Sequence, residues 1–286
     1  MQIRKAQRQK AKLRLGISAP SGAGKSYSSL LLAFGLGGKV GVIDTENGSA
    51  DLYAHLGDYD IIGLQSPYTI SKYLAAIKEF EKEGYTTIII DSLTHAWSGE
   101  GGLLDKQGKI ADSGKGNSYT AWRSITPEHN SLVEAMLQSP CHIIATMRAK
   151  TEYVLETGSN GKQTPKKVGL APIQRDGMEF EFTIFMDIDS MHIATATKDR
   201  TSILDGTYFK ITEQTGKDLL VWLEQGADAP PQLTIDDYRK IMNEAKSKED
   251  KASAWATVPE HIKIIFAQEK ADKKAAIEAK KQGAAA

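Results

Sequence analysis

The sequence has one cysteine, no long apolar run and no excess of one charge. Each of these absences excludes or disfavours a class of protein. Its one cysteine, Cys141, excludes an intrachain disulfide. No apolar run approaches the ~20 residues of a membrane-spanning helix, and the basic N-terminal residues lack the apolar region of a signal peptide. With 36 basic and 36 acidic residues, attraction to nucleic acid would need a local basic patch. We therefore expect a reduced, soluble, cytoplasmic protein with no membrane partner.

Short apolar runs alternate with helical patterns along the 286 residues. "TTIIIDS" is rich in β-branched residues, which is typical of strands buried in a parallel sheet. "ISKYLAAIKEFEKEG" repeats its apolar residues at a helical period and ends in glycine. The alternation predicts an α/β fold whose mainly parallel central sheet is flanked by helices. We expect strands over 13–19, 39–44, 60–64, 86–92, 142–147, 182–189 and 192–198, and helices over 25–37, 70–84, 119–138 and 216–226.

Three segments depart from that alternation. Pro127 is expected to break or restart the helix over 119–138, because proline lacks a backbone donor. The glycine-rich stretch 99–117 and the polar, basic stretch 149–177 are expected to be loops. The last two predicted strands follow each other closely enough for a hairpin.

The chain divides at a proline pair, Pro230 and Pro231, which marks a linker. We predict a basic N-terminal segment (1–11), an α/β core (12–229), and a linker with a small C-terminal helical appendage (230–286), whose composition is rich in Ala, Lys and Glu.

The stretch "APSGAGKSY" nearly fits the phosphate-loop pattern G-x-x-x-x-G-K-[ST], with Ala19 in place of the first glycine. In such a loop, backbone N–H groups and a helix N-terminus bind phosphate. Lys25 would reach the β- and γ-phosphates, and the Ser26 hydroxyl would bind Mg²⁺. The sequence therefore predicts an ATP site formed by Pro20, Ser21, Gly22, Ala23, Gly24, Lys25, Ser26 and Tyr27.

Two carboxylates would complete such a site. Asp91 ends the apolar strand "IIIDS", where it can hold the Mg²⁺ shell through water. Ser92 follows it, so the carboxylate that activates water must come from elsewhere. Glu46, two residues beyond the end of an adjacent strand, is the candidate. An ordinary buried strand can also end in aspartate, and Asp44 and Glu46 could be turn or helix-cap residues.

These residues resemble the RecA/RadA branch of P-loop ATPases, in which a strand ends Asp-x-Glu and a serine follows the magnesium aspartate. A closer similarity is to phage RecA-like, core-only recombinases of the Sak-type single-strand annealing group. It is carried by "APSGAGKSYSSL", "DTENGSA", "IIIDSLTHAW", "ATMRAKTEYVLE", "KKVGLAPIQRDGMEFEF" and "ATKDRT". The resemblance covers residues 12–225 and implies a RecA-like ATPase, with Glu46 as general base and Tyr53 stacking on adenine.

The resemblance also implies that the segments 99–118 and 149–177 face single-stranded DNA. Tyr119, Trp122 and Tyr153 could provide stacking faces, although basic loops are usually solvated and Trp122 could instead be a core residue. The candidate phosphate contacts in and beside the second segment are Arg148, Lys150, Lys162, Lys166, Lys167 and Arg175.

Two further roles follow from the resemblance. Thr146 would sense the γ-phosphate, although RecA itself has glutamine in this region. Lys198 and Arg200 in "TKDRT" are two residues apart in a predicted extended stretch and so point the same way. In this superfamily, such cations reach the γ-phosphate of a neighbouring subunit; the alternative is a surface turn. His95 and His192 lack partners at metal-ligand spacing, and we expect both to be structural.

The sequence therefore predicts a RecA-like ATPase that binds ATP and Mg²⁺ in the cytoplasm of a bacterial host. It would assemble on single-stranded DNA as a filament or ring and promote annealing or strand exchange beside a single-strand-binding protein, with DNA stimulating hydrolysis. Two alternatives stay open. One is a nucleotide or small-molecule kinase with 149–177 as its lid. The other is a nucleotide-dependent assembly or scaffold ATPase whose helices after residue 232 hold a partner.

Overall fold

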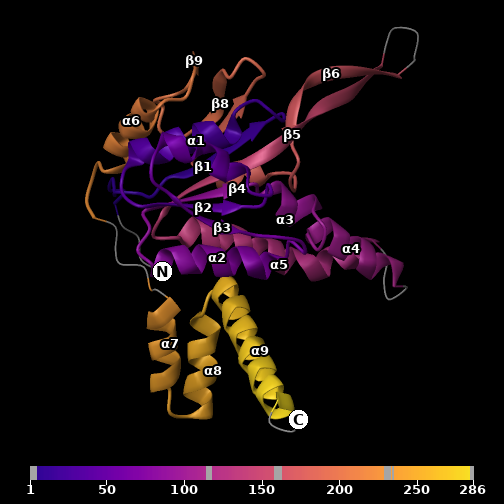
Figure 1. Ribbon diagram of the computed structural model, residues 1–286, viewed down its shortest axis with the longest axis vertical. Helices are drawn as coiled ribbons and strands as arrows, with labels where there is room; N and C mark the ends of the chain where they lie inside the picture. The colour runs from indigo at the N-terminus through magenta and orange to yellow at the C-terminus, as the bar shows by residue number, and fades with distance from the viewer. Residues whose placement is uncertain (1–4, 114–117, 158–162, 229–232, 234, 284–286) are drawn as a thin grey trace.

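The computed structural model describes residues 5–113, 118–157, 163–228, 233 and 235–283. Its central sheet has the strand order β3-β2-β4-β5-β1-β7-β8-β9, and β6 pairs with the outer half of β5 (Figure 1). Pairs from β3 to β7 are parallel, while β8 and β9 are antiparallel, so the predicted mainly parallel sheet is confirmed. The strands are β1 (Arg14–Ala19), β2 (Val40–Asp44), β3 (Asp60–Gly63), β4 (Thr87–Asp91), β5 (His142–Thr157), β6 (Gln163–Pro172), β7 (Ile184–Ile188), β8 (Ala194–Asp199) and β9 (Tyr208–Phe209).

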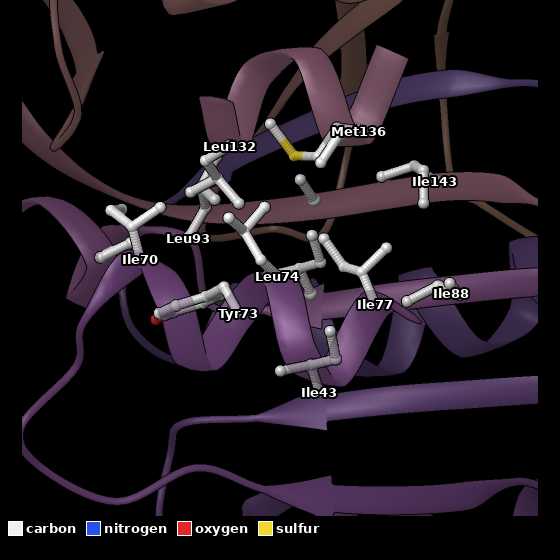
Figure 2. Packing of buried hydrophobic residues seen from close by; sticks show 14 of the residues in the cluster. Ile43, Ile70, Tyr73, Leu74, Ile77, Ile88, Leu93, Leu132, Met136 and Ile143 are labelled. Carbon is white, nitrogen blue, oxygen red and sulfur yellow. The ribbon is translucent and has the colours of Figure 1, made fainter. Parts of the chain in front are cut away.

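Helices cover both faces of the sheet, and each face has its own apolar core. On one face, α1 (Lys25–Leu36) packs beside α6 (Glu213–Leu223). A Cβ on Gly35 would lie 2.0 Å from the Glu213 carbonyl oxygen, so this close crossing depends on glycine. On the other face lie α2 (Ile70–Lys82) and α5 (Ser118–Gln138). Figure 2 shows side chains of both helices packed over the strand residues Ile88 and Ile143.

The helix over 119–138 is not interrupted, so the prediction of a break at Pro127 is wrong. Ala121, Ile125 and Leu132, on both sides of the proline, are buried in the core under α5. This packing outweighs the loss of one backbone donor, which costs about 3 kcal/mol in an unsupported helix.

The two predicted loops are largely regular structure. The stretch 99–117 contains α4 (Leu103–Asp112), preceded by the short α3 (Thr94–Ser98), because Leu103 buries against the core and the glycines before it make the turn. The stretch 149–177 forms a hairpin, since β5 continues to Thr157 and pairs antiparallel with β6. This hairpin projects away from the sheet (Figure 1). The predicted hairpin of β7 and β8 is confirmed.

Beyond the core, α7 (Ile235–Glu244), α8 (Lys248–Thr257) and α9 (Glu260–Gly283) form a separate group (Figure 1). Ile265 of α9 is buried against the core beside α2 and α5. At the other end, the Arg8 guanidinium lies 3.6 Å from the centre of the Trp222 ring. The division at residues 11 and 229 stays a prediction. None of the helices in the described ranges is long and apolar enough to cross a membrane.

Candidate nucleotide site

The segment between β1 and α1 has the backbone of a phosphate-binding loop. Gly22 and Gly24 have φ values of 78° and 89°, which strongly favour glycine. Gly24 is the N-cap of α1, so the positive end of the helix dipole carries no capping side chain. Ala19, in place of the pattern's first glycine, is fully buried and paired in register with Arg148 of β5. An alanine in this extended strand needs no unusual dihedral.

The predicted ATP-binding residues from Pro20 to Tyr27 lie on this loop and the first turn of α1. Lys25 donates from Nζ to the Ala19 carbonyl at 3.2 Å and to the Pro20 carbonyl at 3.1 Å. Burial lowers the pKa of Lys25, against the opposing charges of Asp91 and Glu46. Of the rest of the loop, Ala23 is buried, Pro20, Gly24 and Ser26 are half-buried, and Ser21, Gly22 and Tyr27 are exposed.

Two residues from two other elements donate hydrogen bonds to Asp91, the last residue of β4. Ser26 of α1 donates its hydroxyl to Asp91 Oδ2, and Thr146 of β5 donates to Oδ1 at 2.5 Å. The aspartate is 2% exposed, and burial raises its pKa despite the two donated bonds. Hard cations such as Mg²⁺ prefer oxygen ligands. A buried carboxylate beside a hydroxyl, with neutral donors as its hydrogen-bond partners, therefore suits a bound Mg²⁺.

Glu46 lies beyond the end of β2, next to β4, with its carboxylate facing the end of β5. Its Oε1 accepts from Ser92 Oγ at 3.1 Å and from Arg148 Nε at 3.0 Å, and Arg148 Nη2 donates to Oε2. Burial would raise the pKa of Glu46, but the guanidinium outweighs it and the pKa lies below its ordinary value. Asp44, by contrast, has the contact expected of a turn residue, because its carboxylate accepts from the Glu46 N–H at 2.6 Å.

Two residues that the sequence did not assign to the site fix the strand ends around it. Thr45 Oγ1 accepts from the Ser92 N–H at 2.9 Å and lies 2.7 Å from His95 Nδ1. The His95 ring stacks on Tyr68 with 4.8 Å between ring centres. These contacts tie β2 to β4 just beside Glu46. Only the strand order brings them together, so no local sequence signal could have found them.

The turn between β7 and β8 also reaches the phosphate loop. His192 Nδ1 lies 3.1 Å from the Ala23 carbonyl oxygen, and a Cβ on Gly24 would lie 3.3 Å from the same nitrogen. Near the other side of the loop, the rings of Tyr27 and Tyr53 meet edge to face with 6.0 Å between centres. Tyr53 lies on a 3₁₀ helix, η1 (Ser49–Leu56), that follows the Glu46 turn.

Lys198 and Arg200 do not meet Asp91 within one chain, because β8 is separated from β4 by three strands. Lys198 donates to the backbone carbonyls of Glu179 and Phe180 on η2 (Met178–Glu181), and burial lowers its pKa. β8 ends at Asp199, so Arg200 is exposed one residue beyond the strand.

The predicted DNA-contact residues lie on or beside the β5–β6 hairpin. Arg148 is half-buried at its base, Lys150 is exposed, and Arg175 lies within 3.3 Å of Thr126 Oγ1. Trp122 stacks on Trp97 with 5.5 Å between ring centres, a packing contact. Lys162 and the side chains of Lys166, Lys167, Tyr119 and Tyr153 lie outside the described part of the chain.

In a P-loop NTPase, the first strand of a mainly parallel sheet leads through a glycine loop into a helix, and a nearby strand ends in an aspartate. This chain has that arrangement, with the Asp91 strand β4 separated from β1 by β5 alone. A family model for the AAA domain matches residues 11–217. Because the match spans well over half of the chain, the protein belongs to the AAA domain family and carries an AAA-type P-loop ATPase domain. No curated protein matches it.

Proposed function

We propose that this chain is an ATP-dependent recombinase that binds single-stranded DNA and promotes annealing or strand exchange in phage-type homologous recombination. It would act in the bacterial cytoplasm as a homo-oligomer, a filament or a ring, beside a single-strand-binding protein. The AAA-type ATPase domain and the resemblance to RecA-like phage recombinases support this assignment.

The continuity of β5 carries the proposal. Its first half lies in the central sheet, where Thr146 donates to Asp91, and its second half forms the projecting hairpin (Figure 1). Over residues 148–175, basic side chains outnumber acidic ones. One strand therefore links the nucleotide site to a basic, projecting element of the kind that can neutralise DNA phosphates. Each such contact to a single strand adds about −0.7 to the log–log salt slope of binding.

The residues at the strand ends suit hydrolysis. Glu46 would accept a proton from the attacking water. Lys25 and the loop N–H groups would stabilise charge on the β- and γ-phosphates of ATP. Ser26 and Asp91 would hold Mg²⁺, with Asp91 acting through water, and bound Mg²⁺ would neutralise developing phosphate charge.

Oligomerisation would complete the site. Lys198 or Arg200 would reach the γ-phosphate of a neighbouring subunit, where a positive charge stabilises the transition state. Thr146 would report the nucleotide state to the hairpin, and Tyr53 would contact adenine. The arrangement within one chain is compatible with action in trans, since β8 lies far along the sheet from Asp91.

The decisive experiment measures ATP hydrolysis with and without a single-stranded oligonucleotide over a range of protein concentrations. We expect stimulation by DNA and a rate per subunit that rises with concentration until oligomers form. Lys25→Ala is the inactive control. Absence of ATP-dependent binding to single-stranded DNA at low salt would refute the DNA assignment. Phosphate appearing on a metabolite rather than free in solution would establish a kinase instead.

A further inference from the structure

Both oxygens of the Glu46 carboxylate are engaged by one guanidinium. Arg148 donates from Nε to Oε1 at 3.0 Å and from Nη2 to Oε2, while Ser92 adds a third bond at 3.1 Å. A two-point contact between planar groups is the strongest form of this pair. A carboxylate held this way is a weaker general base, because three of its about four acceptor positions are taken and the guanidinium stabilises its charged form.

The backbone of Arg148 is fixed at the point where β5 leaves the central sheet, while its side chain reaches solvent. Its N–H donates to Thr94 Oγ1 at 2.9 Å, and its carbonyl accepts from the Ile173 N–H at 2.7 Å. The Arg148 side chain is 44% exposed, against 21% for Glu46. A partly exposed ion pair contributes little net stability, so an incoming anion can compete for the guanidinium.

The next residue along β5 already belongs to the hairpin. Ala149 pairs with Pro172 of β6, whereas Arg148 pairs with Ala19 at the phosphate loop. Arg148 is thus the residue at which the predicted DNA-binding element and the nucleotide site meet. A DNA strand lying along the hairpin would bring its phosphates to the exposed side of this arginine.

From this geometry we propose that Arg148 restrains Glu46 in the DNA-free protein, and that a phosphate of single-stranded DNA takes over the guanidinium and frees the carboxylate for catalysis. The proposal rests on the proposed function, because the trigger is DNA on the hairpin. Arg148 exchanges one charge-assisted partner for another, so the release costs little. Arg148 acts here as a positioning residue, because it works through Glu46.

The test compares the DNA-free ATPase of wild-type protein and Arg148→Gln at saturating ATP. We expect the DNA-free kcat to rise about tenfold in Arg148→Gln, with the KM for ATP changed less than about twofold, because Lys25 and the residues of the phosphate loop are unchanged. Stimulation by a single-stranded oligonucleotide should fall close to onefold in the variant. Arg148→Lys, which keeps the charge but cannot make the two-point contact, should give an intermediate DNA-free rate.

Two controls isolate the effect. Arg123→Gln removes the same charge from an exposed position on α5 and should leave the DNA-free rate unchanged. Arg148→Gln combined with Glu46→Gln should lose the gain, since the proposal acts only through Glu46. A gain that persists in the double variant would refute the restraint.

The outcomes separate the two proposals. A DNA-free kcat in Arg148→Gln that is unchanged or lower overturns the restraint, even if wild-type protein is stimulated by DNA. A wild-type rate without DNA stimulation overturns the DNA trigger together with the proposed function. Should Arg148→Gln fail to fold, the comparison of Arg148→Lys with wild type decides the question by the same criteria.

Discussion

Arg14 and Arg148 lie at opposite ends of the stretch over which β1 and β5 pair, and they differ in the groups that hold them. The Arg14 guanidinium is buried and donates to backbone carbonyls, those of Leu13, Leu137, Ser139 and Cys141. Burial lowers its pKa to about 10. Arg148 is held by the Glu46 carboxylate and is half-exposed.

The two ends of this pair of strands therefore differ. We call the Arg14 end structural, because its contacts are to the backbone, and the Arg148 end exchangeable, because its contacts are to side chains. Backbone carbonyls are fixed in the main chain, so the contacts of Arg14 last as long as the fold does. Side-chain partners such as Glu46, Ser92 and Asp91 can change partners when a phosphate or a cation arrives. The carboxyl ends of parallel strands therefore hold the groups that can react, in keeping with the location of ligand sites in open α/β sheets.

The largest expected effect is at the exchangeable end. Glu46→Gln keeps the size of the side chain but replaces one carboxylate oxygen with an amide nitrogen and removes the base, so we expect ATP hydrolysis to fall by about 10²–10⁴-fold. Nucleotide binding should persist, because Lys25 and the loop are untouched. Phosphate release measures the first, and a fluorescent nucleotide titration measures the second. Hydrolysis near the wild-type rate would exclude Glu46 as the general base.

Removal of the two arginines should change the free energy of unfolding by different amounts. Arg14→Met leaves several buried carbonyls without their donor, and we expect the free energy of unfolding to fall by roughly 3 kcal/mol. Arg148→Gln should change it by less than about 1 kcal/mol. Urea unfolding of both variants beside wild type checks this. Equal losses would mean that the two ends of the sheet are both structural.

The structural end should also be sensitive to acid through His142. Its Nδ1 accepts from the Leu13 N–H at 3.0 Å, and burial, with the charges of Lys12 and Arg14, lowers its pKa from 6.5 to about 3. Between these two pKa values, His142 is protonated in the unfolded chain and neutral in the folded chain. Stability is therefore full above pH 6.5 and should fall as pH drops, by up to ~1.4 kcal/mol per pH unit.

Urea unfolding of wild type and His142→Gln, at about pH 7 and about pH 5, measures that loss. The glutamine cannot titrate and still offers an acceptor, so its stability should depend less on pH. A wild-type loss no greater than that of His142→Gln would show that this histidine is protonated in the folded protein.

The sequence allowed the central sheet, α1 and the phosphate loop to be predicted, because buried β-branched runs and the glycine–lysine loop are local signals. The β5–β6 hairpin was missed because its pairing partners lie beyond the local apolar pattern. The predicted helix break at Pro127 was wrong because buried residues on both sides of the proline stabilise α5. Local composition therefore indicated elements, whereas long-range packing decided where they ended.

The candidate site shows the same limit. Glu46 and Asp91 could be proposed because each follows a strand. The contact between Glu46 and Arg148 joins residues 102 positions apart, and it arises only because β2, β4 and β5 are neighbours in the sheet. Thr45 and His95 depend on the same adjacency. A single sequence does not give strand order, so these partners could not be predicted.

The smallest expected effect concerns an ion-pair cluster on α9, away from both ends of the paired strands β1 and β5. Glu269 of α9 accepts from Arg239 at 2.6 and 2.7 Å and from Lys78, joining α9 to α7 and α2. Its side chain is 32% exposed, so solvent and salt weaken these bonds. Glu269→Gln should lower the free energy of unfolding by about 0.5–1 kcal/mol at low salt, and by less in molar salt. A larger, salt-independent loss in urea unfolding would mean that this cluster resembles the fixed contacts of Arg14, and that α9 is held as rigidly as the strands.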